Sequence, residues 1–234
     1  MSDLPKIAIL FLTYKRTGMA LKTIQSTCKN LNYPKELLSF YVADDGSPKE
    51  HVDSIIECIQ DLGIHILGGH NKRMRHPGQE DTHHSGLGWN LGLGLCHQAT
   101  DYVLVEEDDW ELDEPLDMEH YIRVMQRREE IGLMSFRILS VGADVHTVSE
   151  DGEIFLRYLR TTQYAYSGNP HIRHARFTKA YGWFSEDRNP GNIELHQDDQ
   201  YRLATEGPEI WRPYTISQWG AWKHIGDVPT WRAE

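Results

Sequence analysis

The sequence predicts an α/β protein built on a mostly parallel, Rossmann-like central sheet flanked by helices. Two observations support this fold class. Short apolar runs alternate with segments of helical periodicity over roughly the first hundred residues, which is typical of strands joined by right-handed helical crossovers. Polar side chains, mostly carboxylates, follow directly after several of these runs. The carboxyl edge of an open α/β sheet is where ligands bind, so these polar groups mark a candidate site.

The first half of the chain has the clearest elements. The run at 6–13 is almost continuously apolar, which indicates a strand buried on both faces. In the segment 52–62, Val52, Ile55 and Ile59 share one helix face. In order, we expect a strand at 6–13, a helix at 17–30, a strand at 38–43, a helix at 52–62, a strand at 64–67, a polar loop at 68–86, a helix at 87–98 and a strand at 101–105.

The second half is less regular. We expect a helix at 116–130, a strand at 131–139, a hairpin arm at 154–163, a helix at 173–182, a short helix at 198–206 and an irregular, Trp-rich tail from Ile210. No repeat, low-complexity segment or linker divides the chain, so we expect a single domain over 1–234. The polar loop at 68–86 is rich in histidine and flanked by glycines, which suggests a lid.

Bulk properties restrict the function classes. The formal net charge of −11 disfavours nonspecific attraction to nucleic-acid phosphates. The three cysteines are widely spaced and odd in number, which is typical of reduced thiols in a cytoplasm rather than of a disulfide framework or a zinc site. The N-terminus lacks a signal-peptide pattern, and no segment approaches the roughly 20 apolar residues of a membrane span. We therefore expect a cytoplasmic protein without a transmembrane segment.

The most informative stretch is the acidic run 106–109, Glu-Glu-Asp-Asp, which follows the apolar strand at 101–105. Four like charges at the end of a buried strand are costly unless a cation lies beside them. Hard divalent cations take oxygen ligands, and Mg²⁺ sites typically combine one or two carboxylates with substrate phosphates. The run therefore predicts a metal site, with a solvated acidic loop as the alternative.

Three strand ends, taken in order, resemble a known family. They read Thr13-Tyr14-Lys15-Arg16, then Asp44-Asp45-Gly46-Ser47, then the acidic run. This order resembles the GT-A glycosyltransferases, in particular glycosyltransferase family 2, in which the acidic run is the DXD-type metal motif. Further motifs extend the resemblance over roughly residues 5–226: Gly88-Trp89-Asn90-Leu91-Gly92, then Pro170-His171-Ile172-Arg173, then Tyr181-Gly182-Trp183-Phe184-Ser185-Glu186, then Gln197-Asp198-Asp199-Gln200-Tyr201-Arg202.

The resemblance implies a site for a nucleotide-diphosphate sugar in the first half of the chain, about 1–110. Thr13, Tyr14 and Arg16 would contact the nucleotide. For Tyr14, whose ring offers a face for stacking on the base, the alternative is a ring packed on the next helix.

At the second strand end, the resemblance assigns Asp44 to the base and Asp45 to a supporting role. A carboxylate there can accept hydrogen bonds from a base or a ribose, although an Asx turn is the alternative for either residue. Asn90 fits the family's Asn-x-Gly helix before the metal motif, and the resemblance assigns it to the nucleotide sugar. Family members often carry Arg just before this Asn, where the chain has Trp, so Arg73 or Arg75 would bind the phosphates instead.

For the metal, a divalent cation such as Mn²⁺ or Mg²⁺, the resemblance implies Asp109 as the first ligand and Glu107 at the other end of the DXD-like triplet. Glu107 or Asp108 would reach the ribose or a metal-bound water. His224 is a candidate third ligand, because many GT-A enzymes close the metal site with a late His. The alternative for His224 is a surface residue.

The acceptor and catalytic half would be about 111–234. There Asp198-Asp199 stands where the family usually has Glu-Asp, and the second position is the general base of inverting members. Asp199 therefore receives the base role, because the reaction needs one carboxylate to take the proton of the acceptor hydroxyl. The alternative is an acidic residue at a helix start.

The expected function is metal-dependent, inverting transfer of a hexosyl or pentosyl group from a nucleotide-diphosphate sugar to an acceptor hydroxyl. The acceptor stays open between a glycan, a lipid-linked saccharide, a protein and a modified nucleic-acid base. A nucleotidyltransferase is disfavoured because the loop after the first strand is poor in Gly. A metallohydrolase is disfavoured because H-x-H and H-E-x-x-H spacings are missing. A non-catalytic protein that binds sugar or nucleotide remains a further alternative.

Overall fold

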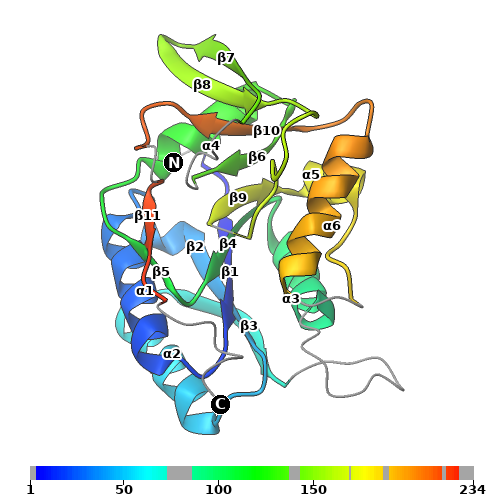
Figure 1. Ribbon diagram of the computed structural model, residues 1–234. Coiled ribbons are helices and arrows are strands. Elements are labelled where there is room, and N and C mark those ends of the chain that lie inside the picture. The colour runs from blue at the N-terminus through cyan, green and yellow to red at the C-terminus, as the bar shows by residue number, and fades with distance from the viewer. Residues whose placement is uncertain are drawn as a thin grey trace.

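The computed structural model describes residues 4–72, 86–136, 143–168, 170–186, 190–217 and 220–226. Within these ranges, nine strands form one sheet in the order β3-β2-β1-β4-β9-β6-β10-β8-β7, and β5 pairs with β11 (Figure 1). The strands are β1 (Ile7–Thr13), β2 (Leu38–Asp44), β3 (His65–Asn71), β4 (Tyr102–Glu107), β5 (Trp110–Leu112), β6 (Ile131–Ser135), β7 (Val145–Glu150), β8 (Glu153–Tyr158), β9 (His171–His174), β10 (Glu209–Pro213) and β11 (Trp222–His224).

The parallel part of the sheet consists of β1 to β4. β1 lies between β2 and β4, and Ile7 pairs with Leu38 on one side and with Tyr102 on the other. The three strands therefore end nearly level, with Thr13 opposite Asp44. All seven residues of β1 are buried, which confirms the prediction of a strand covered on both faces.

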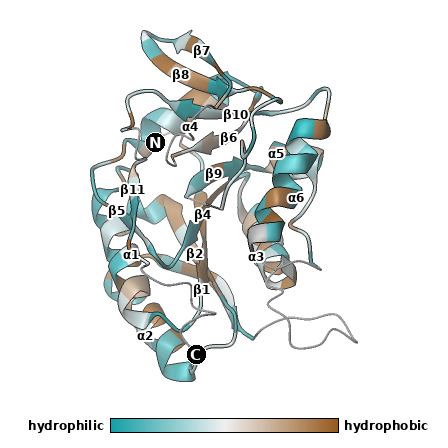
Figure 2. Cartoon of the chain, in the orientation of Figure 1, coloured by the Kyte–Doolittle hydropathy of each residue, from teal (hydrophilic) through white to brown (hydrophobic). Residues whose placement is uncertain are grey.

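Helices cover both faces of this part of the sheet (Figure 1). One face packs Ile7, Ile9 and Phe11 against α1, α2 and α4, and the other packs Ala8 and Leu10 against α3, α5 and α6. The apolar colour is accordingly concentrated on the central strands (Figure 2). The helices are α1 (Thr17–Asn30), the 3₁₀ helix η1 (Lys35–Leu37), α2 (Lys49–Asp61), α3 (Gly86–Ala99), α4 (Met118–Arg127), α5 (Ala175–Tyr181) and α6 (Pro190–Leu203).

The rest of the sheet is mixed. β9 lies antiparallel between β4 and β6, β10 is parallel to β6, and the β7–β8 hairpin continues the sheet from β10. The short pair β5–β11 lies outside this sheet and sets His224 opposite Trp110. This pairing brings the last described segment of the chain to the residues that follow β4.

The α/β fold class and the expected elements of the first half are confirmed, with shifts of a few residues. β3 continues to Asn71, so the expected loop at 68–86 starts later, and residues 73–85 lie outside the described part of the chain. In the second half, the strand at 131–139 is confirmed as β6 up to Ser135, and the hairpin arm is confirmed as β8.

The helix expected at 173–182 is confirmed as α5, but it begins only at Ala175, because residues 171–174 form β9, a strand fixed by pairing with β4 and β6. Two further expectations for the second half need larger corrections. α6 begins at Pro190, so Asp198 lies in its third turn and not at a helix start. The tail from Ile210 forms β10 and β11 where an irregular segment was expected.

In the ranges that the structure describes, no helix combines the length and apolar character needed to cross a membrane.

Candidate active site at the carboxyl edge of the sheet

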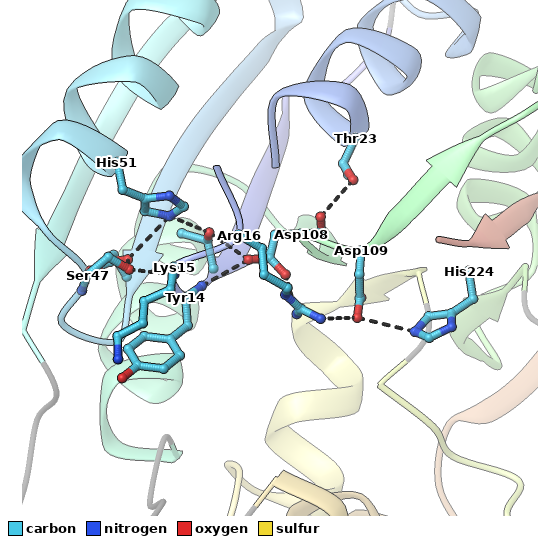
Figure 3. A network of polar contacts seen from close by, with 11 residues as sticks. Tyr14, Lys15, Arg16, Thr23, Ser47, His51, Asp108, Asp109 and His224 are labelled. Atoms are coloured by element: carbon cyan, nitrogen blue, oxygen red, sulfur yellow. Dashed lines mark hydrogen bonds and ion pairs between the residues drawn. The ribbon is translucent and has the colours of Figure 1, made fainter. Parts of the chain in front are cut away.

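Side chains from the ends of β1 and β4 and from β11 form one polar network at the carboxyl edge of the parallel strands (Figure 3). Residues predicted from three separate motifs meet there: Thr13, Arg16, Asp108, Asp109 and His224. Thr13 ends β1 and Arg16 lies in the loop after it, the two aspartates follow β4, and His224 comes from β11.

Asp108 anchors the loop that follows β1. Its Oδ2 accepts hydrogen bonds from the Thr13 hydroxyl at 2.8 Å and from the Tyr14 N–H at 2.9 Å, and its Oδ1 pairs with Arg16. The side chain is 1 % exposed, and burial raises the pKa of Asp108 to about 6 against the opposing effect of Arg16. Both oxygens of Asp108 therefore already have partners within the protein. The sequence predicted that Asp108 would contact a ribose or a metal-bound water, and in this structure neither oxygen is left unpaired for such a contact.

Asp109 lies between two cationic or potentially cationic groups. Its Oδ2 is 2.6 Å from Arg16 Nη1 and 3.2 Å from His224 Nε2. Its Oδ1 is buried and has no hydrogen-bond partner. A buried carboxylate oxygen without a partner is uncommon, so this atom could accept a contact from a ligand.

His224 is placed by backbone pairing. The β5–β11 register sets it opposite Trp110, whose ring centroid lies 4.9 Å from the imidazole. Gly226 contributes by being small, because a Cβ there would lie 2.7 Å from Asp109 Oδ2 and 3.2 Å from His224 Nε2. A larger residue at 226 would displace the Asp109 carboxylate and crowd the His224 ring.

The donor set fits a divalent cation. Asp109 Oδ2 and His224 Nε2 are 3.2 Å apart, within hydrogen-bond distance, and a carboxylate beside an imidazole is a donor pair that could hold such an ion. Among the described residues, no group of three or more His, Cys, Asp or Glu side chains is arranged to hold an ion. Substrate oxygens and water would therefore complete the coordination, as is usual for Mg²⁺.

Glu106, at the head of the acidic run, has a structural role that the sequence did not reveal. Its Oε1 accepts hydrogen bonds from Trp222 Nε1, at 2.8 Å, and from the Thr27 hydroxyl. The residue has no exposed surface, and burial raises the pKa of Glu106 to about 8. Glu106 thereby ties β11 to β4 and α1, and so supports the position of His224.

Glu107 faces a different partner from the two aspartates. A Cβ at Gly168 would lie 3.0 Å from Glu107 Oε1 and 2.7 Å from Glu194 Oε1, so the two carboxylates approach each other beside that glycine. Burial raises the pKa of Glu107 well above its usual range, and Asp109, Glu194 and Asp108 act in the same direction. The structure thus brings Glu194 of α6, which the motifs did not indicate, to the end of β4.

The two aspartates at the end of β2 have different surroundings. Asp44 has no exposed surface, and its Oδ2 accepts hydrogen bonds from the N–H groups of Gly46, at 2.9 Å, and Ser47, at 2.7 Å. This is the Asx turn that the sequence offered as the alternative. Asp45, by contrast, is partly exposed at the same edge.

The loop after β1 has an unusual backbone. Lys15 has φ of 60°, in the left-handed region that residues other than Gly rarely adopt. Its N–H donates to Ser47 Oγ at 2.8 Å, and its ammonium lies 4.8 Å from the centre of the partly exposed Tyr14 ring. Non-glycine residues in this conformation cluster at binding sites, which supports the assignment of this loop to a ligand.

Asn90 faces the protein interior. Its Nδ2 donates to Phe184 O and to Glu186 Oε1, both at 2.9 Å, and its Oδ1 accepts from the Phe184 N–H at 2.9 Å. The resemblance assigned Asn90 to the nucleotide, whereas the structure uses it to join α3 to the segment before α6.

The predicted acidic pair on α6 divides. Asp198 is buried, and its two oxygens accept hydrogen bonds from the N–H groups of Tyr164, at 3.0 Å, and Tyr166, at 3.1 Å. The Asp199 side chain is 59 % exposed and lies 3.9 Å from Arg202. Neither aspartate therefore lies in a polar network like the one that Asp108 and Asp109 form with Arg16 and His224.

Arg73 and Arg75, the predicted phosphate ligands, lie outside the described residues. His51 of α2 was missed. It is buried against Thr13 and Thr17, and its ring lies 3.6 Å from Asp44 Oδ1. A polar residue on the inner face of an amphipathic helix is the one sequence signal that marks it.

No family model matches the chain, and no curated protein matches it in sequence. Solved structures do match. Residues 1–349 of TarS from S. aureus align with a TM-score of 0.58 at 15% identity, over 89% of this chain and 60% of TarS 1–349.

Two further structures give the same TM-score of 0.58. A mannosyltransferase from Pyrobaculum calidifontis, in complex with GDP-Man and Mn²⁺, is 12% identical over 98% of this chain and 59% of its own. GalNAc-T7, with UDP, GalNAc and Mn²⁺, is 11% identical over 94% of this chain and 46% of its own. The chain thus spans about half to three fifths of these three solved chains, and it has the GT-A glycosyltransferase fold.

Proposed function

We propose that this chain transfers one sugar, a hexosyl or pentosyl group, from a nucleotide-diphosphate donor to an acceptor hydroxyl. The carrying observation is the pair Asp109 and His224 at the carboxyl edge of the sheet, with the buried, unpartnered Asp109 Oδ1 beside it. The fold supports the proposal, since two of the solved structures that share it hold a nucleotide or nucleotide sugar together with Mn²⁺.

Asp109 and His224 would hold a divalent cation, Mn²⁺ or Mg²⁺. When bound, the cation would neutralise the charge that grows on the diphosphate as the sugar leaves. The guanidinium of Arg16 is within ion-pair distance of Asp108 and Asp109, so it adds a fixed positive charge at the same edge. This arrangement favours a diphosphate over a neutral ligand.

The nucleotide would lie along the ends of β1 and β2. Thr13, Tyr14 and Arg16 line this loop, the partly exposed Tyr14 ring offers a stacking face, and Asp45 offers an acceptor for a base or ribose. Arg73 and Arg75 remain predicted phosphate ligands.

The general base has two candidates, both on α6. The family pattern names Asp199, whereas one observation favours Glu194: its carboxylate lies beside Glu107 at the end of β4. A single carboxylate on the acceptor side that takes the hydroxyl proton corresponds to one displacement, and hence to inversion at the anomeric carbon. The acceptor is an alcohol of a glycan, a lipid-linked saccharide, a protein or a modified base.

The proposal is tested by thermal denaturation with UDP, GDP, CDP and ADP, each with and without Mn²⁺. A ligand that binds only the folded state stabilises it by RT ln(1 + [L]/Kd). We expect at least one nucleotide to raise the melting temperature, and to raise it further when Mn²⁺ is present. If no nucleotide has an effect with or without Mn²⁺, the proposal is wrong.

A further inference from the structure

His51 links the ends of β1 and β2, the two strand ends along which we propose that the nucleotide lies. It lies in the first turn of α2, and its residue exposure is 3 %. Its Nε2 is 2.8 Å from Thr13 Oγ1, and its Nδ1 is 2.8 Å from Thr17 Oγ1. Asp44 Oδ1 lies 3.6 Å from Nε2. The imidazole therefore contacts the ends of β1 and β2 and the start of α1.

The hydrogen bonds fix which ring nitrogen carries the proton. The Thr13 hydroxyl donates to Asp108 Oδ2, so Thr13 Oγ1 has only lone pairs to offer to His51. His51 must then donate from Nε2–H, and its Nδ1 accepts from the Thr17 hydroxyl. Burial lowers the pKa of His51, while Asp44 acts in the opposite direction, which agrees with a neutral ring.

This relay ends on the loop that we assign to the nucleotide. Asp108 accepts hydrogen bonds from the Thr13 hydroxyl, the Tyr14 N–H and the Arg16 guanidinium. Lys15, with its left-handed backbone, lies between Tyr14 and Arg16. A strained backbone persists only where its surroundings fix it. Thr13, where the relay reaches the loop, is two residues before the strained Lys15.

We propose that His51, as a neutral imidazole with its proton on Nε2, is a positioning residue that holds Thr13 and Asp108 and so shapes the loop Thr13–Arg16 for the donor nucleotide. The inference rests on the proposed function. It differs from a purely structural role in one consequence: loss of the ring hydrogen bonds impairs nucleotide binding in molecules that are fully folded.

Two substitutions separate the hydrogen bonds from the shape of the ring. His51→Phe keeps an aromatic ring and removes both bonds, whereas His51→Gln keeps a side-chain N–H that can donate to Thr13. The control is His97→Phe on α3, where the imidazole Nε2 lies 3.0 Å from Thr178 Oγ1, far from the loop in sequence and on the opposite face of the sheet. Each variant is titrated by calorimetry with UDP, GDP, CDP and ADP plus Mn²⁺, below its measured unfolding transition.

We expect His51→Phe to weaken binding of the nucleotide that wild type prefers by roughly 10–100-fold, the usual effect of removing a residue that orients a ligand-binding group. His51→Gln should restore most of this loss, and His97→Phe should change only the melting temperature. Wild-type affinity in folded His51→Phe, or an equal loss in His97→Phe, overturns the inference. A wild type that binds none of the nucleotides overturns the proposed function and this inference together.

A second measurement decides the matter if His51→Phe does not fold. The ¹⁵N shifts of a neutral imidazole distinguish its two tautomers, and the spectrum of His51→Gln identifies the His51 signals by their loss. We expect the Nε2–H tautomer in wild type near neutral pH. The Nδ1–H tautomer, or a protonated ring, would break the relay and overturn the inference even when the nucleotide binds.

Discussion

The acidic residues at the carboxyl ends of β1 and β4 and those on α6 were both predicted from family motifs. Only the first group lies together as the motifs predicted. At the ends of β1 and β4, Asp108 and Asp109 meet Arg16 and His224 as one network. On α6, the acidic pair divides into a buried Asp198 and an exposed Asp199. The difference has a physical origin, because parallel register fixes where strands end, whereas helix rotation decides which way neighbouring residues point.

The largest expected effect tests the α6 surface. Glu194→Gln should lower kcat by roughly 10²–10⁴-fold, the usual contribution of a positioned base, because its carboxylate lies beside Glu107 at the end of β4. Asp199→Asn should leave kcat near wild type, because its side chain is exposed. Nucleotide affinity should be preserved in both variants. The reverse ranking of kcat would return the base role to Asp199 and give the family motif precedence over the geometry.

The second prediction concerns Glu106, the buried carboxyl that ties β11 to β4 and α1 behind Asp109 and His224. The pKa of Glu106 is about 8 in the folded protein and lies near the usual carboxyl value in the unfolded chain. Between these values the unfolded state gives up this proton first, so Glu106 should lower the free energy of unfolding as pH rises from about 4.5 to about 8, by at most roughly 1.4 kcal/mol for each pH unit. The raised pKa values of Glu107 and Asp108 act in the same direction in both proteins. Glu106→Gln, which keeps an acceptor for Trp222, should lack only the contribution of Glu106.

Urea denaturation of wild type and Glu106→Gln at pH 5 and pH 8, with EDTA present, measures the effect. The two proteins should be close in stability at pH 5, and the variant should be the more stable at pH 8. If the stability difference between them is the same at both pH values, Glu106 ionises normally in the folded state. Asp113→Asn, on an exposed residue, serves as the control for loss of one charge.

A smaller effect separates structure from binding at Asn90. Asn90→Ala removes three hydrogen bonds between α3 and the segment around Phe184 and leaves buried groups without partners. We expect it to lower the free energy of unfolding by roughly 1–3 kcal/mol. Nucleotide affinity in the folded variant should stay at the wild-type value. A large loss of affinity without loss of stability would place Asn90 on the nucleotide, as the family pattern has it.

Much of the first half of the fold could be predicted from sequence, because each element there carries its own signal. The apolar run of β1 and the helical periodicity of α1 are local properties, and both elements lie where they were expected. The acidic residues after β4 could be placed for the same reason. The strand end itself is visible in the sequence.

The remainder depends on contacts between distant segments. β9 is fixed by two neighbouring strands rather than by its own four residues, and β11 by its pairing with β5. The roles of Glu106, Glu194 and His51 also depend on partners far along the chain, such as Trp222 and Gly168. Sequence spacing contains no record of these partners.

The central claim is that Asp109 and His224 hold a divalent cation together with a nucleoside diphosphate. Electron paramagnetic resonance measures free Mn²⁺ as protein is titrated with and without the nucleotide that binds best. Wild type should bind one Mn²⁺, more tightly when the nucleotide is present. Asp109→Asn should lose this binding while it remains folded, and Glu111→Gln, which removes a nearby carboxylate paired with Lys22, should keep it. Equal Mn²⁺ affinity in Asp109→Asn and wild type would contradict the claim.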